Sequence, residues 1–193
     1  ISATLTLSAN VIAGNSAALG SGVCMVGGAL SMTNNALIDN PGAGGGLYLA
    51  GGGADLLHNT FARNLGGGVY LTGYDLVDAT AAMTNTIMAD QSSDVSAATG
   101  STALVDGVLW YPAADIAGAV TVDPVVEYTG DPAFAADGYH LTAPSQALDQ
   151  GLENGLTVDI DGEPRPWNEA PDLGADELSL SLELSKQAAP DPV

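Results

Sequence analysis

The amino-acid sequence predicts an all-β fold, a right-handed parallel β-helix: a solenoid with coils of about 25 residues, a C-terminal cap and a terminal extended strand. The first observation behind this prediction is a repeated phrase that opens with asparagine. Its four copies span 10–15, 35–40, 59–64 and 85–90, and their first residues lie 25, 24 and 26 positions apart. A fixed period in the twenties is typical of a solenoid, because one such unit cannot bury its own apolar side and must stack on copies of itself.

The second observation is a glycine turn that runs into a short alternating strand. Its copies span 22–25, 45–49 and 67–71, and a further short strand precedes each asparagine, as at 5–7 and 30–32. Alternation with a period of two places successive side chains on opposite faces of a strand. We therefore expect Cys24, Tyr48 and Tyr70 to share the outer face, while their apolar neighbours line the interior.

The third observation separates this fold from leucine-rich repeats, which have a similar period and a regularly placed asparagine. Leucine-rich repeats need a helix or 3₁₀ segment on the convex side. Here the segments between the expected strands consist mainly of Gly, Ser, Ala and Asn, and no amphipathic run of ten residues interrupts them. The composition therefore favours the parallel β-helix.

The repeated asparagines have a structural role in such a fold. Stacked strands lie roughly 4.8 Å apart, so side-chain amides at equivalent positions bond along the axis as a ladder. Asparagine also tolerates the left-handed backbone of a tight bend. The predicted ladder consists of Asn10, Asn35, Asn59 and Asn85. Two positions further on, the predicted apolar stack inside the coils consists of Ile12, Leu37, Phe61 and Ile87.

Charge divides the chain into two parts. Residues 1–74 hold Asp39, Asp55 and Arg63 as their only charged side chains, for a net charge of −1, whereas the remainder carries −19. A nearly neutral surface of small polar residues has little like-charge repulsion to keep copies apart. An acidic chain with three basic residues is not expected to bind nucleic acid. Because no run of eighteen apolar residues occurs, no transmembrane segment is predicted either.

The cysteine and the histidines give no sequence signature of a catalytic or metal site. Cys24 is the single cysteine, so an intrachain disulfide is excluded, and we expect it to be a surface thiol. His58 and His140 are 82 residues apart, which is not a metal-ligand spacing.

After about residue 103 the repeat loses its register, and a different series of motifs follows. These are Asp-Pro-Ala-Phe at 131–134, Gly-Tyr-His-Leu at 138–141, Pro-Ser-Gln-Ala-Leu-Asp-Gln-Gly at 144–151, Asp-Ile-Asp-Gly-Glu-Pro-Arg-Pro at 159–166 and Asp-Leu-Gly-Ala-Asp-Glu at 172–177. In this order they resemble the C-terminal signature of bacterial surface proteins of the "choice-of-anchor Q" kind, which are right-handed β-helix proteins of the pectate-lyase-like superfamily. Upstream, Phe-Ala-Arg-Asn at 61–64 is similar to the repeats of polymorphic outer-membrane proteins. Both resemblances imply an exported β-helix at the cell surface, with adhesion or assembly as the commoner role.

The expected organisation has three parts: β-helix coils at 1–125, a C-terminal cap segment at 126–177, and an amphipathic strand with a tail at 178–193. The strand alternates strictly and places four leucines on one face, namely Leu178, Leu180, Leu182 and Leu184. An exposed leucine stripe on a strand edge promotes aggregation, so this face is expected to be buried. Two alternatives stay open: the strand folds back on its own β-helix, or it adds to a neighbouring copy.

The stretch 159–166 contains the candidate cation site. Asp159, Asp161 and Glu163 alternate around a glycine, and their oxygens suit Ca²⁺, although the EF-hand pattern is missing. The alternative is a solvated turn that closes the cap. Arg165 follows directly, and we expect it to form a salt bridge with Glu163 or Asp161.

The sequence favours a structural role over catalysis. We expect a non-enzymatic extracellular or cell-surface protein, an adhesin or a filament or matrix subunit that assembles with copies of itself, because end-to-end contacts that do not close give open fibres. The alternative is a polysaccharide lyase, a glycosidase or a glycan-binding module that acts on surface glycans. Lyases on this fold use an arginine as base, and Arg63, flanked at corresponding sites by Asp39 and Asp90, is the candidate. Tyr48 and Tyr70 offer a surface for weak sugar stacking, and no cofactor is expected beyond Ca²⁺.

Overall fold

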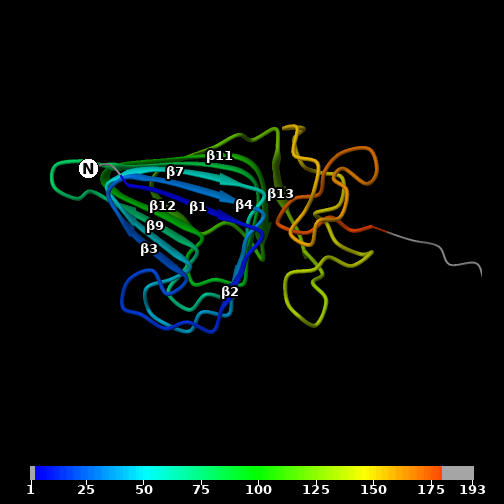
Figure 1. Cartoon of the computed structure of the whole chain (residues 1–193), viewed down its shortest axis with the longest axis horizontal. Helices are drawn as coiled ribbons and strands as arrows, with labels where there is room; N and C mark the ends of the chain where they lie inside the picture. Colours follow the sequence, from blue (N-terminus) through cyan, green and yellow to red (C-terminus); the bar gives the residue numbers. More distant parts are fainter. Residues whose placement is uncertain (1–2, 180–193) are drawn as a thin grey trace, which may run out of the picture.

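The computed structural model describes residues 3–179, whose parallel strands stack coil upon coil as a β-solenoid, which confirms the predicted fold class (Figure 1). Within these residues the strands are β1 (Thr4–Ser8), β2 (Val11–Ala13), β3 (Val23–Val26), β4 (Ala29–Thr33), β5 (Ala36–Ile38), β6 (Leu47–Ala50), β7 (Gly52–Leu57), β8 (Thr60–Ala62), β9 (Val69–Thr72), β10 (Ala79–Ala89), β11 (Val95–Tyr111), β12 (Ile116–Val122) and β13 (Glu127–Thr129). The described part of the chain contains no helix long and apolar enough to cross a membrane.

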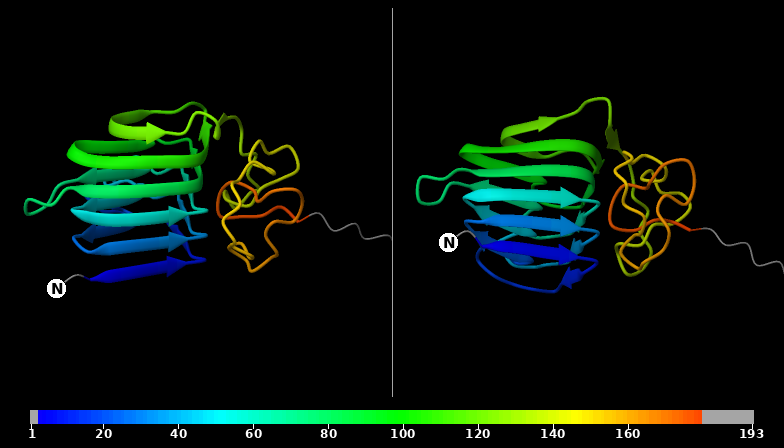
Figure 2. Two further views of the ribbon diagram at one scale, coloured as in Figure 1. Left: turned by 90° about the horizontal axis from the view of Figure 1, so that it is seen from above. Right: turned by 45° about the horizontal axis from the view of Figure 1, so that its top comes forward.

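Each coil contributes to three parallel sheets, here called the first, second and third sheets. The first sheet contains β1, β4, β7 and the early part of β10, followed by the middle of β11 and by β12. The second sheet contains β3, β6, β9 and the start of β11. The third sheet contains β2, β5, β8, the ends of β10 and β11, and β13. Figure 2 shows the stack rising from the N-terminal coil in blue to the last coils in green.

The core consists of apolar columns that run along the stack. In the first sheet one inward column is Leu5, Leu30, Ala54, Ala81, Ala103 and Val120, and the next is Leu7, Met32, Leu56, Met83, Val105 and Val122. Members of the middle coils are buried, and each fully buried Leu or Met side chain contributes roughly 1.5–3 kcal/mol. The period-two pattern of the sequence therefore sets which side chains form the core.

The corners between the second and the first sheet require glycine. Gly27 and Gly28 connect β3 to β4, and Gly51 and Gly52 make the same turn one coil later, all with positive φ. A Cβ atom on Gly52 would lie 2.2 Å from the carbonyl oxygen of Gly28. The stacked backbones thus approach too closely for a side chain at the second glycine of each pair, and the positive φ favours glycine at the first.

The predicted asparagine ladder is present in its first three copies. Asn10 donates through Nδ2 to Oδ1 of Asn35 at 3.0 Å, and Asn35 donates in the same way to Asn59 at 3.1 Å. The backbone N–H groups of Asn10 and Asn35 donate to the same oxygens. Asn35 and Asn59 therefore each satisfy two donors of the preceding coil.

The assignment of Asn85 to this ladder is wrong by one residue. The register of β10 pairs Thr84 with Leu57 and Ile87 with Thr60, so Thr86 lies over Asn59. Asn85 takes the left-handed corner position with φ of 53°, which Asn34 occupies two coils earlier, also at 53°. The turn before β10 is longer than in the earlier coils, and its additional residues shift the phrase by one position.

The same shift removes Ile87 from the predicted core stack. Ile12, Leu37 and Phe61 are in register as predicted, and the column continues with Met88 and Trp110. Ile87 is still fully buried, but it points outward against the C-terminal segment.

A second polar ladder runs at the end of the third sheet, and the prediction did not include it. It consists of Asn15, Asn40, Asn64 and Gln91, and it begins with the backbone N–H of Asn15, which donates to Oδ1 of Asn40. Asn40 donates to Oδ1 of Asn64 at 2.9 Å, and Asn64 donates to Oε1 of Gln91 at 3.0 Å. Gln91 lies five positions after Thr86, as Asn64 lies five positions after Asn59. The second ladder therefore continues into this coil although the asparagine phrase is displaced there by one residue.

The segment from 131 to 179 lies beside the stack and covers the outer face of the third sheet (Figure 2). Its apolar side chains pack on outward residues of that sheet; they are Leu141, Ala147, Ile160, Leu173 and Ala175. Polar bonds add to this contact, because Ala175 N donates to Thr60 Oγ1 and Asn34 Nδ2 donates to the carbonyl oxygen of Val158. The segment is thus attached to a side of the solenoid and leaves the two ends of the stack uncovered.

The predicted assembly strand falls largely outside the described residues. Leu178 is half-buried against the segment that covers the third sheet, and its N–H donates to Asp172 Oδ2 at 2.8 Å. Leu180, Leu182 and Leu184 lie outside residues 3–179.

Candidate functional site

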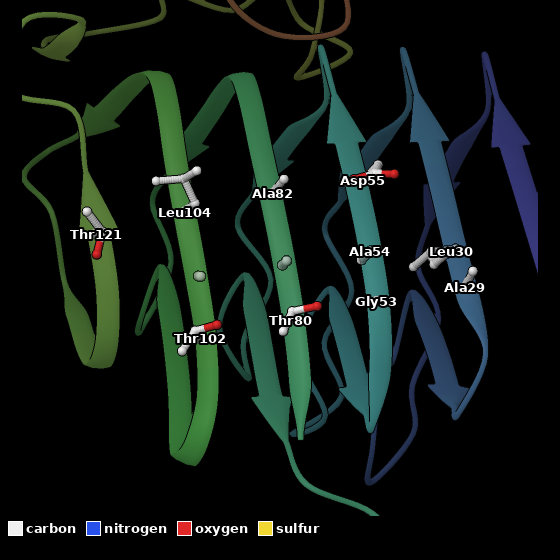
Figure 3. A pocket seen from close by; sticks show the side chains of 12 residues that line it. Ala29, Leu30, Gly53, Ala54, Asp55, Thr80, Ala82, Thr102, Leu104 and Thr121 are labelled. Carbon is white, nitrogen blue, oxygen red and sulfur yellow. The ribbon is translucent and has the colours of Figure 1, made fainter. Parts of the chain in front are cut away.

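A groove of about 460 Å³ follows the outer face of the first sheet (Figure 3). Small side chains from successive strands form its floor, including Ala29, Gly53, Thr80 and Thr102. Of the residues that line it, Asp55 is the single titratable one. General acid–base catalysis of glycosidic cleavage uses two carboxyl groups at a defined separation, and this groove supplies one.

The candidate catalytic base Arg63 is held by Asp39, the flanking acid that the repeat alignment indicated. Arg63 donates through Nε and Nη2 to the two carboxylate oxygens at 2.8 and 2.7 Å, and it also donates to the carbonyl oxygen of Gly138 at 3.3 Å. The hydrogen bonds from Arg63 lower the pKa of Asp39, and those to Asp39 raise the pKa of Arg63. This pairing stabilises the charged guanidinium and so disfavours its use as a base.

Arg165 is buried between the C-terminal segment and the solenoid, with different partners from those expected. It donates through Nε to Glu177 at 3.0 Å, through Nη1 to Asn34 Oδ1 at 3.1 Å and through Nη2 to the carbonyl oxygen of Asp176 at 2.6 Å. The expected salt bridge to Glu163 or Asp161 does not form within the described residues. Arg165 instead connects the solenoid corner at Asn34 to residues 176–177.

The proposed calcium ligands Asp159, Asp161 and Glu163 do not converge on one point. Asp159 is buried, and its oxygens accept the backbone N–H groups of Asp161, Glu163 and Glu177. Glu163 accepts the hydroxyl of Ser179 at 2.5 Å. Asp159 thus shapes the turn, while the carboxylates of Asp161 and Glu163 face different partners.

Asp161 instead meets His140, which is the centre of a cluster that the sequence did not reveal. His140 Nε2 lies 2.5 Å from Asp161 Oδ2 and 4.0 Å from Asp176 Oδ1. His140 Nδ1 lies 2.7 Å from Asp137 Oδ2. The ligand atoms of His140, Asp161 and Asp176 all lie within 4.8 Å of one another, and no other such group of three occurs in the part of the chain that the structure describes.

The acidic partners control the charge of this cluster. Burial by itself lowers the pKa of His140, but the hydrogen bonds to Asp137 and Asp161 and the charge of Asp176 outweigh it and raise the pKa to about 9. Burial raises the pKa of Asp176 to about 6. His140 is therefore a cation at neutral pH and is surrounded by carboxylates from three separate loops.

His58 occupies the left-handed corner next to the ladder and is fully buried. Its Nε2 accepts from the side-chain amides of Asn85 at 2.9 Å and Asn154 at 2.8 Å, so the ring proton belongs on Nδ1. Within residues 3–179 this Nδ1 has no hydrogen-bond partner. Burial, with the charge of Arg165, lowers the pKa of His58 to about 3, so the ring is neutral.

The outward tyrosines form a short stack along the axis, as their predicted common face requires. Tyr48 and Tyr70 are in register on β6 and β9, and their ring centroids lie 5.5 Å apart with an interplanar angle of 11°. Cys24 is exposed one coil earlier in the same column. An uncharged hollow of about 390 Å³ lies beside the rings.

Both ends of the solenoid are open within the described residues. At the N-terminal end β1, β2 and β3 each pair with one strand, and at the other end β12 and β13 pair with β11 alone. Interior columns therefore reach the surface there: Leu5 is 39% exposed, whereas Leu30, one coil inward in the same column, is 2% exposed. At the other end Val120, in the same column, is only partly buried.

Comparison of the chain with protein-family models, with curated proteins and with solved structures finds no match. The resemblance to the "choice-of-anchor Q" signature and to polymorphic outer-membrane repeats therefore stays a prediction.

Proposed function

We propose that this protein is a non-enzymatic structural solenoid of the cell surface or the extracellular space, an adhesin or a filament or matrix subunit, whose copies associate end to end. The two open ends carry this proposal. A second copy placed on the N-terminal coil would cover Leu5 and extend its column, and β12 of one copy would meet β1 of the next with unpaired backbone groups on both sides. Such a contact is heterologous and leads to open fibres.

The chemistry of the outer faces supports a structural role over a catalytic one. The groove of the first sheet has one titratable side chain, and both described arginines are engaged in ion pairs with acids. The first part of the chain is almost free of charge, so the surfaces of the first coils present little like-charge repulsion to another copy. The extracellular location rests on the resemblance of 131–177 to surface proteins.

Self-association of the full chain tests the proposal directly. We expect the sedimentation coefficient to rise with protein concentration and electron micrographs to show rods one solenoid wide. The variant Leu5→Asp places a charge at the open end and should abolish association, because a buried unpaired carboxylate is strongly unfavourable. The matched control Thr102→Asp places the same charge on the exposed wall of the first sheet and should associate as the wild type does.

Circular dichroism shows whether each variant keeps its β structure before association is compared. A wild-type protein that stays monomeric at high concentration contradicts the proposal. Equal association by the Leu5→Asp and Thr102→Asp variants contradicts the end-to-end geometry, and loss of association in Thr102→Asp alone indicates lateral contacts through the first sheet.

A second candidate function is the binding of a neutral surface glycan beside Tyr48 and Tyr70. The uncharged hollow next to these rings favours it, since sugar rings pack against aromatic side chains. The two tyrosines use one ring face each on their mutual stack, which leaves less aromatic area for a ligand. A glycan array with wild type and Tyr70→Ala tests this candidate. Binding that is lost in the variant supports it, whereas no binding, or binding that Tyr70→Ala leaves unchanged, contradicts it.

A further inference from the structure

We propose that His140, Asp161 and Asp176 form a binding site for a divalent transition metal, of which Zn²⁺ is the best match. The three side chains come from separate loops of the segment that covers the third sheet, and their ligand atoms lie within 4.8 Å of one another. The donor set contains one imidazole nitrogen and two carboxylate groups. This site is distinct from the calcium site expected from the sequence, because it leaves out Asp159 and Glu163.

The distances fit a tetrahedral ion after small movements of the side chains. With metal–ligand distances of about 2.0–2.2 Å, tetrahedral ligands lie roughly 3.4 Å apart. His140 Nε2 lies 4.0 Å from Asp176 Oδ1 and 2.5 Å from Asp161 Oδ2, so the required separation falls between them. The Asp161 side chain is 44% exposed and is free to move back by less than 1 Å. A water molecule would complete the coordination.

The buried carboxylate of Asp176 provides an independent reason to expect a ligand. Its side chain is only 7% exposed, and Oδ2 accepts the backbone N–H of Leu141 at 2.7 Å. The other oxygen, Oδ1, accepts no hydrogen bond within residues 3–179 and points toward His140 Nε2 at 4.0 Å. This long ion pair with His140 is the one contact of Oδ1 among the described residues, and a metal ion held between the two groups would give the carboxylate a closer partner.

The surroundings of His140 match those of a metal-binding histidine. Metal-binding histidines usually donate their other ring N–H to a carboxylate, which fixes the ring and raises its basicity. Asp137 occupies this position, with Oδ2 2.7 Å from Nδ1. The ring of Tyr139 packs on the imidazole at a centroid distance of 4.2 Å. His140 therefore presents Nε2 in a fixed direction, and a metal ion would bind there in place of the proton that this nitrogen carries in the ion-free protein.

The nature of the donors indicates which ion is preferred. Imidazole nitrogen suits zinc, nickel and copper, whereas Ca²⁺ takes six to eight oxygen ligands. The site offers one nitrogen and few oxygens, so Zn²⁺ should bind in strong preference to Ca²⁺. A bound ion would join the loops that carry Asp137, Asp161 and Asp176, and would thereby stabilise the folded segment over the unfolded chain.

Titration calorimetry of the untagged, metal-depleted full chain with zinc chloride tests this proposal. We expect one ion per chain, a rise in melting temperature with Zn²⁺, and no comparable effect of Ca²⁺. His140→Gln and Asp161→Asn should weaken zinc binding by more than tenfold, and Asp137→Asn by about 10–100-fold through the orientation of His140. Asp161 is exposed, so this variant should keep the fold, which circular dichroism verifies.

Two variants serve as controls. Glu169→Gln removes one exposed charge from the same segment outside the cluster, and Glu163→Gln removes a ligand of the expected calcium site; both should bind zinc as the wild type does. The proposal is overturned if zinc does not bind, which would leave His140 as an ion-pair partner, or if His140→Gln and Asp161→Asn bind zinc unchanged. Preferential calcium binding that Glu163→Gln abolishes would instead support the site at 159–163.

Discussion

At the scale of single residues, the interior asparagines hold neighbouring coils together by amide bonds. Asn59 accepts the backbone N–H and the side-chain amide of Asn35 at 3.0 and 3.1 Å, and its own amide donates to the carbonyl oxygens of Met32 and Leu57. The bonds between Asn59 and Asn35 and the bond to Met32 are buried, so these groups depend on one another for hydrogen bonding.

Substitution Asn59→Ala should therefore destabilise the protein by roughly 2–4 kcal/mol, because it leaves several buried donors and acceptors unpaired. Urea unfolding measures this free energy. Asn15→Ala is the matched control: Asn15 is exposed in the first coil, and its loss should amount to about 1 kcal/mol or less. Equal effects of the two substitutions would contradict a dependence on burial.

Asp172 should make stability depend on pH in the neutral range. Burial raises its pKa from 3.8 to about 7, so between about pH 7 and 4 the folded chain retains a proton that the unfolded chain releases. Protonation thus favours the folded state, and the melting temperature should rise as the pH falls from 8 to 6.5. Asp172→Asn should show a smaller rise. An identical pH profile for the variant and the wild type would contradict this assignment.

His58 acts in the opposite direction at lower pH. Its pKa falls from 6.5 to about 3 on folding, so below pH 6.5 the unfolded chain binds a proton that the folded chain does not. Stability is lost as the pH falls from 6.5 toward 3. In thermal melts His58→Gln should lose less stability over this interval than the wild type, and a greater loss in the variant would disprove the prediction.

At the scale of elements, the segment 131–179 is fastened to the third sheet by apolar packing and by Arg165. Removal of this side chain in Arg165→Met leaves the buried carboxylate of Glu177 without its cation, so we expect a loss of roughly 3–5 kcal/mol in urea unfolding. Arg63→Met removes the ion pair of the other described arginine, which is partly exposed and should contribute about 1 kcal/mol or less. A larger loss for Arg63→Met would reverse this ranking.

At the scale of the whole molecule, stability should fall from the middle of the stack toward its open ends, since each coil contacts only its neighbours. Phe61 and Ile12 belong to the same column, but Phe61 is fully buried in a middle coil and Ile12 only partly buried in the first. Phe61→Ala should destabilise the protein by about 3–5 kcal/mol, and Ile12→Ala by about 1–2 kcal/mol. Both are measured by urea unfolding at a concentration where the protein is monomeric. Similar losses for the two variants would contradict a fall in stability toward the ends of the stack.

The sequence by itself determined the solenoid, its period, and the inward and outward faces of its strands. These features depend on local rules: alternation with a period of two decides which side chains point inward, and a constant repeat length lets successive coils stack in register. The ladder positions Asn10, Asn35 and Asn59 and the stack positions Ile12, Leu37 and Phe61 followed from the same repeat.

Tertiary structure decided the register of β10 and the site around His140. The phrase at 85–90 fits two registers locally, because asparagine suits both the ladder and the left-handed corner. The observed register, with Asn85 at the corner, is the one in which Met88 packs in the core and Ile87 packs against the covering segment. His140, Asp161 and Asp176 are far apart in sequence and meet because turns such as that at Asp159 bring their loops together. No periodic pattern encodes such a meeting, since the covering segment has no repeat and its course depends on the surface on which it packs.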